Sequence, residues 1–246
     1  RLWRGNRQFG RPDARGKRHL INKRLHRARM TVIVRPNPEE ETPVKLSYSP
    51  TSPYVRKVMV LLHETGQIED VTLENISTTP LAPDAALLPN NPLAKVPALV
   101  RDEGPALYDS RVICAYLDDR AGGKLYPTGS RRWDTLTLEA TADGMLDAAL
   151  SMVYEGRMRP EGKQVPEWVE GQWSKIERAC AALNTRWISQ LSGPLDMGQI
   201  AVGCALGYLD FRHDARNWRK GNDALADWAR RFDSRASMQA TAPPAG

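Results

Sequence analysis

The sequence predicts an α/β plus all-α fold, with a small mixed segment at residues 44–124 and an all-helical segment at residues 131–244. Short apolar runs of strand length alternate with helix-period segments from Val44 onward. Strand signals stop after Tyr126 and Pro127, and only helix-period patterns follow. With 246 residues, 41% of them hydrophobic, the chain is long enough to build a buried core.

Turn signals delimit the elements of the mixed segment. Ser52 and Pro53 begin a helix, because a Ser oxygen accepts an orphan amide hydrogen and Pro fits the first helical position. A crossover helix between parallel strands, then a hairpin and a closing helix, predicts a mixed sheet with helices on both sides. The expected elements are strands at 44–48, 71–74, 98–101 and 106–108, helices at 53–65 and 110–121, and a Pro-bounded helical turn at 83–88.

The second segment is expected to be a helical bundle whose Trp side chains and aliphatic ridges form its core. Asp196, three residues before Gln199 and followed by an apolar run, indicates a capping box with a folding role. The expected helices lie at 131–154, 166–190, 197–211 and 221–232.

The positive charge of the chain is concentrated in a basic extension at residues 1–43. Residues 1–30 contain 11 Arg and Lys against one acid, Asp13, which leaves 24 bases and 28 acids in the rest. A nucleic-acid or anionic-membrane arm, a targeting segment, and translated sequence upstream of a start at Met30 all fit this asymmetry. We favour the start at Met30 and expect residues 1–43 to be disordered.

Several classes of site have no signal in the sequence. Cys114, Cys180 and Cys204 lie far apart and form no CxxC or metal-ligand spacing, which favours a reducing compartment and inert thiols. The four histidines show no ligand spacing, and no Walker-type loop, GxGxxG or HExxH is present. No run of 18 apolar residues exists, so we expect no spanning helix. We therefore predict no metal site and no membrane partner.

A hydroxyl cluster at the start of the first helix is the first candidate site. Ser49, Thr51 and Ser52 lie where the helix dipole and the first-turn amides would stabilise an anion, a thiolate as readily as a phosphate. The alternative is that Ser52 only caps the helix. Arg56 either adds positive potential to this site or is a solvated helix residue.

Two further motifs can contribute to the same site. The Val96–Pro97 bond precedes a strand, so a cis Pro would free the backbone groups of Val96 to bind an extended peptide, whereas a trans Pro would simply begin an edge strand. Asp109 and Ser110 begin a helix and either cap it or bind a zwitterion, with Asp109 on the ammonium and Ser110 with the helix amides on the carboxylate.

Together these motifs resemble the glutathione S-transferase family, specifically its bacterial, serine-type, cytosolic members. The similar stretches are Ser-Pro-Tyr-Val-Arg-Lys at 52–57, Asn-Pro-Leu-Ala-Lys-Val-Pro-Ala-Leu at 91–99 and Asp-Ser-Arg-Val-Ile-Cys-Ala-Tyr-Leu at 109–117, supported by 199–212 and 237–244. The resemblance covers residues 44–244. It implies a thioredoxin-like N-terminal domain, an all-helical C-terminal domain, a homodimer and a cytoplasmic location.

The resemblance also implies residue roles. Val96, beside an expected cis Pro97, would pair with the cysteinyl backbone of glutathione. Asp109 and Ser110 would bind its γ-glutamyl end, and Lys95 its glycyl carboxylate. Ser52, with Ser49 and Thr51 as rivals, would donate a hydrogen bond to the thiolate.

The implied activity is conjugation. Ser at position 52 in place of the Cys of thiol-type members favours transfer of an electrophile to glutathione, in detoxification, over thiol exchange. Glutathione would be a co-substrate and no other cofactor is expected. The hydrophobic electrophile would lie against the helix at 131–154, near Leu146, Met152 and Tyr154, while Tyr54 fits either a subunit contact or the core.

Two other functions compete with conjugation. A binding or regulatory protein on the same scaffold would need no turnover, although it could lose any of the site motifs, which are all present here. A nucleic-acid-binding protein would depend on the basic extension, and the acidic character of the remaining chain makes this partner unlikely on charge grounds.

Overall fold

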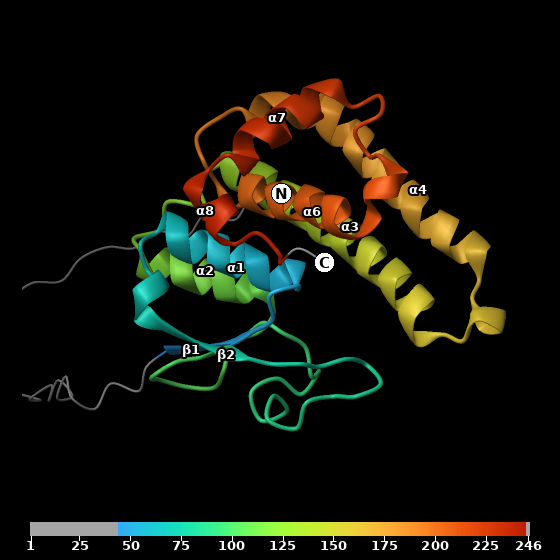
Figure 1. Ribbon diagram of the computed structural model, residues 1–246. Helices are drawn as coiled ribbons and strands as arrows, with labels where there is room; N and C mark the ends of the chain where they lie inside the picture. The colour runs from blue at the N-terminus through green and yellow to red at the C-terminus, as the bar shows by residue number, and fades with distance from the viewer. Residues whose placement is uncertain (1–43, 245–246) are drawn as a thin grey trace, which may run out of the picture. The chain divides into compact units, whose positions relative to one another are not determined.

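The computed structural model describes residues 44–244 (Figure 1). The predictions for the basic extension, disorder over 1–43 and a start at Met30, fall outside the described residues. Residues 44–244 all belong to one compact unit, so the limits of the two domains stay a prediction. Within this part of the chain, no helix is both long enough and apolar enough to cross a membrane.

A three-stranded sheet begins the described chain, with the strand order β2-β1-β3. The central strand β1 (Val44–Tyr48) pairs in parallel with β2 (Val71–Asn75) and antiparallel with β3 (Ala98–Val100). Helix α1 (Pro53–Glu64) supplies the crossover that a parallel pair requires. The predicted order of strand, helix, strand is therefore confirmed.

The predicted strand at 106–108 is reduced to a single antiparallel bridge between Leu99 and Leu107. These two residues exchange both backbone hydrogen bonds, at 2.9 and 2.8 Å. The chain enters α2 (Ser110–Arg120) almost directly after Leu107, which leaves no length for a ladder. The hairpin is present, but its second arm is too short to be a strand.

Helices α1 and α2 pack side by side on one face of the sheet (Figure 1), so the prediction of helices on both sides is wrong. The segment at 83–88 forms turns instead of a helix, with i to i+3 hydrogen bonds such as Leu87 to Asp84 at 3.2 Å. Pro83 and Pro89 bracket this segment, and Pro disfavours helix continuation through the residue before it. Leu87 is fully buried and anchors the turns.

The rest of the described chain is helical, as predicted. The second expected helix continues through a π-helical turn, Leu183–Trp187, and the short last helix was not expected. Trp173, Trp218 and Trp228 are buried in this part, which confirms their core role, whereas Trp168 is exposed. The helices are α3 (Arg131–Met158), α4 (Pro166–Ala182), α5 (Ile188–Leu191), α6 (Met197–His213), α7 (Asp223–Asp233) and α8 (Ala236–Ala240).

Asp196 caps α6, as its spacing predicts. Its Oδ1 accepts a hydrogen bond from the amide of Gln199 at 3.1 Å, and its Oδ2 accepts one from the hydroxyl of Thr135 at 2.9 Å. The reciprocal half of the capping box is absent, because the side chain of Gln199 donates to the carbonyl of Pro194 at 2.7 Å instead. Asp196 thus joins α6 to α3 and has the folding role expected of it.

Helix α1 connects the sheet to the helical part by packing against α6 and α8 (Figure 1). Gly207 on α6 makes this approach possible, because a Cβ at that position would collide with the guanidinium of Arg56. Arg56 is buried and donates to the carbonyl of Met238 at 3.0 Å. The interpretation of Arg56 as a solvated residue is therefore wrong, since close helix packing removes it from water.

Candidate functional site

The strand register brings the three predicted motifs to one edge of the sheet. Ser47 pairs with Ala98, so the hydroxyl cluster follows β1 at the end of the sheet where Val96 and Pro97 precede β3. The Leu99–Leu107 bridge brings the segment that leads to Asp109 beside the start of β3. The segment around Val96 thus lies between the hydroxyl cluster and the start of α2.

Ser52 occupies the cap position of α1. Its hydroxyl oxygen accepts a hydrogen bond from the amide of Val55 at 3.3 Å, and its carbonyl accepts one from the amide of Arg56 at 3.0 Å. An oxygen that accepts from a helix amide keeps its own hydroxyl hydrogen available as a donor. The cap and a donor toward a bound anion are therefore compatible in one residue.

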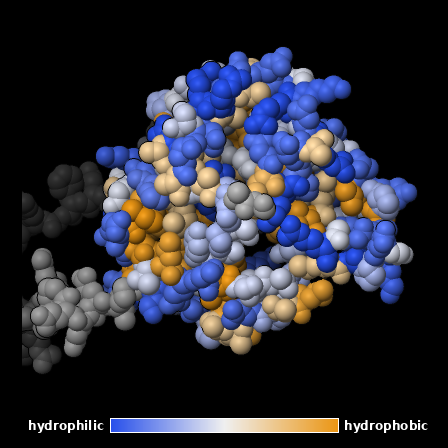
Figure 2. All heavy atoms as spheres, in the orientation of Figure 1, coloured by the Kyte–Doolittle hydropathy of each residue, from blue (hydrophilic) through white to orange (hydrophobic). Residues whose placement is uncertain are grey.

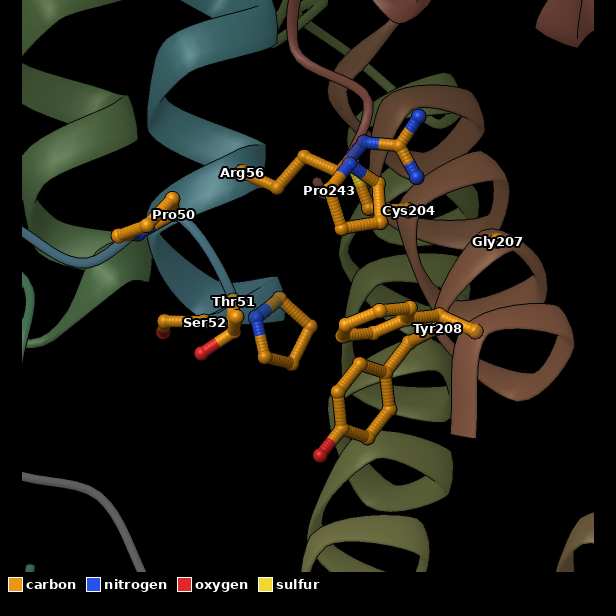
Figure 3. Close-up of a pocket in the computed structure, with 10 residues that line it drawn as sticks. Pro50, Thr51, Ser52, Arg56, Cys204, Gly207, Tyr208 and Pro243 are labelled. Carbon is orange, nitrogen blue, oxygen red and sulfur yellow. The ribbon is translucent and has the colours of Figure 1, made fainter. Parts of the chain in front are cut away.

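The three hydroxyls of the cluster differ in their surroundings. Thr51 and Ser52 line a hollow between the start of α1 and α6, whereas Ser49 does not line it (Figure 3). All three residues are half-buried. The carbonyl of Ser49 accepts the amide of Ser52 at 3.1 Å, which closes the turn that leads into α1.

The backbone of Val96 is available for binding. The Val96–Pro97 peptide bond is cis. Among the hydrogen bonds of residues 44–244, none uses the backbone amide or carbonyl of Val96. Pro97 is buried and Val96 is half-buried, so the two polar backbone groups lie at the edge of the sheet beside the protein surface.

Lys95 is exposed, and the loop that carries it is ordered by Asn91. The buried side chain of Asn91 donates to the carbonyl of Lys95 at 2.7 Å and accepts from the amide of Leu93 at 3.0 Å. Sequence reasoning missed Asn91, although a buried Asn within a Pro-bounded loop is a typical loop-ordering residue.

Asp109 caps α2 and forms an ion pair with Arg111. Its Oδ1 accepts from the amide of Arg111 at 3.0 Å, and its Oδ2 lies 2.8 Å from Nη2 of the same residue. These hydrogen bonds hold the pKa of Asp109 below its usual value, against the opposing effect of partial burial. Ser110 is buried. The ion pair of Arg111 was not predicted, because a separation of two residues from Asp109 at the start of a helix matches no sequence signal.

A buried ionic cluster lies behind the start of α2. Nζ of Lys57 is 2.6 Å from Oδ1 of Asp143 and 3.4 Å from Oε1 of Glu139, and the hydroxyl of Tyr126 donates to Glu139. Burial alone would lower the pKa of Lys57, but Asp143, Cys114 and Glu139 raise it overall. Burial raises the pKa of both carboxyls despite the attraction of Lys57.

The ionic cluster, Lys57 with Glu139, Asp143 and Tyr126, is linked to the candidate site through Arg111. Its Nε lies 3.7 Å from Oδ2 of Asp143, which is buried and has no hydrogen-bond partner. Arg111 therefore lies between the carboxylates of Asp109 and Asp143. Sequence reasoning missed this cluster, because partners on α1 and α3 are far apart in the chain.

The hollow beside Ser52 has an aromatic wall on α6, formed by Tyr208 and Phe211 (Figure 3). Figure 2 shows this face of the molecule as a mixture of hydrophilic and hydrophobic residues, hollowed near its middle. The complete lining consists of Pro50, Thr51, Ser52, Pro53, Arg56, Cys204, Gly207, Tyr208, Phe211 and Pro243.

The residues expected beside a second substrate lie mostly elsewhere. Leu146 and Met152 are buried in the core, so the expectation that they line the pocket of the electrophile is wrong. Tyr154 is half-buried on α3. Tyr54 is a domain-joining residue, since its hydroxyl donates to Asp147 on α3 at 2.5 Å.

The three cysteines are buried. Burial raises the pKa of all three thiols, to about 11 for Cys204, so they are neutral at physiological pH. This confirms the expectation of inert thiols. Within residues 44–244, no three His, Cys, Asp or Glu side chains form a group suited to a metal ion.

Two family models match the chain. One, described as the N-terminal domain of glutathione S-transferase, matches residues 46–125. The other, described as the C-terminal domain of glutathione S-transferase, matches residues 166–231. The two matches cover the sheet with its helices and most of the helical part.

Solved structures and a curated relative are also similar. A glutathione transferase family member from Pseudomonas fluorescens Pf-5 with bound glutathione is 50% identical, with a TM-score of 0.80 over 82% of this chain and 100% of that chain. A structure of such a family member with bound S-(propanoic acid)-glutathione is 48% identical, with a TM-score of 0.76 and the same coverage. The uncharacterized GST-like protein YibF of Escherichia coli K12 is 34% identical over 82% of this chain and 99% of its own length.

Proposed function

Because the chain belongs to the glutathione S-transferase family, we propose that it binds glutathione at the sheet edge and activates the thiol for attack on an electrophilic carbon. The observation that supports this proposal is the strand pairing, because the segments that lead to Ser52, Val96 and Asp109 with Ser110 adjoin β1, β3 and the Leu99–Leu107 bridge. Glutathione-bound relatives of the same fold support the binding half of the proposal.

Each part of glutathione has a candidate partner in this arrangement. The unpaired backbone groups of Val96 would exchange hydrogen bonds with the cysteinyl residue, as an added strand does. Asp109 would pair with the γ-glutamyl ammonium, and Ser110 with the first amides of α2 would bind its carboxylate. Exposed Lys95 would attract the glycyl carboxylate.

The proposed role of Ser52 follows from the energy needed to form a thiolate. A free thiol has a pKa near ~8.5, and lowering it by about two units requires roughly 2.7 kcal/mol of preferential stabilisation of the anion. One hydroxyl donor and the end of a helix dipole each contribute about 1 kcal/mol or more in a partly dry site. Ser52 would thus act as a hydrogen-bond donor, neither base nor nucleophile.

Conjugation is favoured over thiol exchange by the state of the cysteines. Thiol exchange needs a protein thiolate that forms a mixed disulfide, and all three cysteines are buried with raised pKa values. The relative with bound S-(propanoic acid)-glutathione carries a glutathione whose sulfur is substituted by carbon, as in a conjugation product. The reaction forms a C–S bond while the leaving group departs with its electron pair.

Further parts of the proposal concern the setting of the reaction. Glutathione is a co-substrate, and no other cofactor takes part. The electrophile is a hydrophobic small molecule that occupies the hollow lined by Tyr208 and Phe211. We also propose a homodimer in the cytoplasm with a role in detoxification, and sedimentation of the purified chain tests the dimer.

The proposal is tested by retention on immobilised glutathione and by conjugation kinetics with an aryl halide. The variants are Ser52→Ala, Ser49→Ala and Thr51→Ala. We expect Ser52→Ala to raise the pKa of bound glutathione by about one unit and to lower turnover at neutral pH about tenfold. Ser49→Ala is the matched control, because its hydroxyl does not line the hollow.

Two results would contradict the proposal in different ways. Full activity of Ser52→Ala would show that Ser52 is not the hydrogen-bond donor to the thiolate. Impaired activity of Thr51→Ala would then assign that donor role to Thr51. Glutathione binding by the wild type without turnover of any electrophile would favour a binding or regulatory protein on this scaffold.

A further inference from the structure

The aromatic wall of the hollow carries positive charge beside it. Tyr208 and Phe211 line the hollow together with Thr51 and Ser52, and the phenol oxygen of Tyr208 points away from Arg56 (Figure 3). Arg212 follows Phe211 on α6, and its guanidinium carbon lies 3.8 Å from the centroid of the Phe211 ring. A guanidinium stacked on a ring keeps its N–H groups free along its edges.

A second arginine, Arg157, lies on α3. It follows Tyr154 by one helical turn, so both lie on the same side of α3, which packs along α6. Burial raises the pKa of Tyr208, while Arg212 and Arg157 act on it in the opposite direction and Tyr154 acts in the same direction as burial. These directions agree with the helix spacing, which puts Arg157 on the side of α3 that carries Tyr154.

Neither arginine is neutralised by the described part of the protein. Within residues 44–244, no carboxylate lies within 4.0 Å of a guanidinium nitrogen of Arg157 or Arg212. The neighbouring carboxylates are already paired, Glu155 with Arg159 at 2.7 Å and Asp210 with Arg219 at 2.5 Å. Among residues 44–244, Arg212 beside the Phe211 ring and Arg157 on α3 thus have no carboxylate partner.

We infer that the electrophile carries a carboxylate, which Arg157 and Arg212 bind while an apolar part lies against Tyr208 and Phe211 and the reacting carbon faces Ser52. This inference rests on the proposed function, and it adds the substrate class. A carboxylate is the group that arginine binds with two parallel hydrogen bonds. Arg157 and Arg212 would be specificity-determining residues, outside the chemical step.

A matched pair of probes isolates the charge of the electrophile. In p-(bromomethyl)benzoate and p-(bromomethyl)benzamide the same benzylic carbon reacts, with bromide leaving as the C–S bond to glutathione forms. Only the group at the far end of the ring changes, from an anion to a neutral amide. The buried neutral thiols of the protein do not compete for either probe.

We divide the kcat/KM of the wild type for each probe by the uncatalysed rate of that probe. We expect the resulting value to be higher for the benzoate than for the benzamide. The double variant Arg157→Gln/Arg212→Gln should lower this ratio about tenfold, since a partly exposed charge pair contributes about threefold to binding per arginine. Arg157→Lys/Arg212→Lys should retain most of the preference, and high salt should reduce it in the wild type. Arg132→Gln, at the opposite end of α3, is the control.

The outcomes distinguish a failure of this inference from a failure of the proposed function. An unchanged benzoate-to-benzamide ratio in the double variant, with both probes still conjugated, would overturn the inference and leave the proposed function intact. A rise in the KM for glutathione that is equal with both probes would also overturn it, because the arginines would then bind glutathione. Absence of conjugation of either probe by the wild type would overturn both.

A binding measurement gives a readout without turnover. Calorimetry with the two preformed thioether products should show tighter binding of the carboxylate product to the wild type. In the double variant, the ratio of the affinities for the carboxylate and amide products should fall about tenfold. Equal affinity of the wild type for the two products would contradict the inference.

Discussion

At the scale of single residues, the candidate site uses each polar side chain in two ways. Ser52 accepts a helix amide through its oxygen and keeps a hydrogen to donate. Asp109 accepts the amide of Arg111 and pairs with its guanidinium, while more than half of its side chain stays exposed, at 54%. Capping therefore fixes the direction of both side chains without consuming their capacity to bind a ligand.

Asp109 offers a test of the γ-glutamyl end of the proposed site. Asp109→Asn preserves the cap, because Asn is an equally good cap residue, but it removes the negative charge. We expect the KM for glutathione to rise about fivefold, with the pKa of the bound thiol unchanged. Steady-state kinetics and a pH titration of thiolate absorbance measure the two quantities.

The matched control is Asp119→Asn, an exposed substitution near the other end of α2. It should leave the KM for glutathione as in the wild type. A shift in thiol pKa in Asp109→Asn, as large as in Ser52→Ala, would show that Asp109 acts on the sulfur and contradict its assignment to the γ-glutamyl end.

At the scale of elements, the position of α1 is fixed at both ends. Its start carries Ser52, and near its last turn Glu64 forms two hydrogen bonds with Arg235, at 2.8 Å each, and accepts from Ser237 at 2.5 Å. Arg235 caps α8. Helix α8 therefore anchors the end of α1 that lies opposite the candidate site.

The Glu64 contact predicts a pH dependence of stability. Hydrogen bonds from Arg235 hold the pKa of Glu64 below its unperturbed value of 4.5, against partial burial and with help from Ser237. Because the folded-state pKa is lowered, Glu64 contributes fully to the free energy of unfolding above its unfolded-state pKa. This contribution is lost as the pH falls through the folded-state pKa. The wild type should therefore lose stability below about pH 4.5 partly through Glu64.

Urea unfolding at about pH 6 and about pH 3.5 measures this dependence. Glu64→Gln should be less stable than the wild type at the higher pH by roughly 1 kcal/mol, and this difference should shrink at the lower pH. Glu161→Gln, exposed in a short 3-10 turn, is the control and should follow the wild type. A difference that stays constant with pH would contradict the assignment.

At the scale of the whole molecule, the ionic cluster joins the sheet-bearing part to the helical part. Lys57 on α1 is fully buried and pairs with Glu139 and Asp143 on α3. Burial raises the pKa of each carboxyl and outweighs the attraction of the Lys57 ammonium, which lowers it. The contact between α1 and α3 therefore includes a buried ammonium shared by two carboxyls.

Loss of this charge should destabilise the whole described unit. We expect Lys57→Met to lower the free energy of unfolding by about 3 to 5 kcal/mol, because it removes the ammonium from two buried carboxyls. The triple variant Lys57→Met/Glu139→Gln/Asp143→Asn should recover part of that loss, since it removes the unpaired charges as well. Chemical denaturation measures both, and a triple variant less stable than Lys57→Met would contradict this account.

The sequence by itself determined the order of the elements and the local start signals. Ser52 before Pro53, and Asp109 at the start of α2, predict helix caps because capping depends on residues within one turn. Family resemblance, carried by the same short motifs, predicted the class of fold that the comparisons show. Periodicity predicted the long helices, but it does not separate side chains in a pocket wall from side chains in the core, and Leu146 and Met152, expected in the wall, are core.

Only the tertiary structure decided which distant residues contact one another. The register of β1 with β3 pairs Ser47 with Ala98, and helix packing buries Lys57 against Asp143 and stacks Arg212 on Phe211. The physical reason is that capping is local, whereas burial and charge pairing depend on packing between segments far apart in the chain. A sequence pattern can identify a buried face, but it does not name the partner across it.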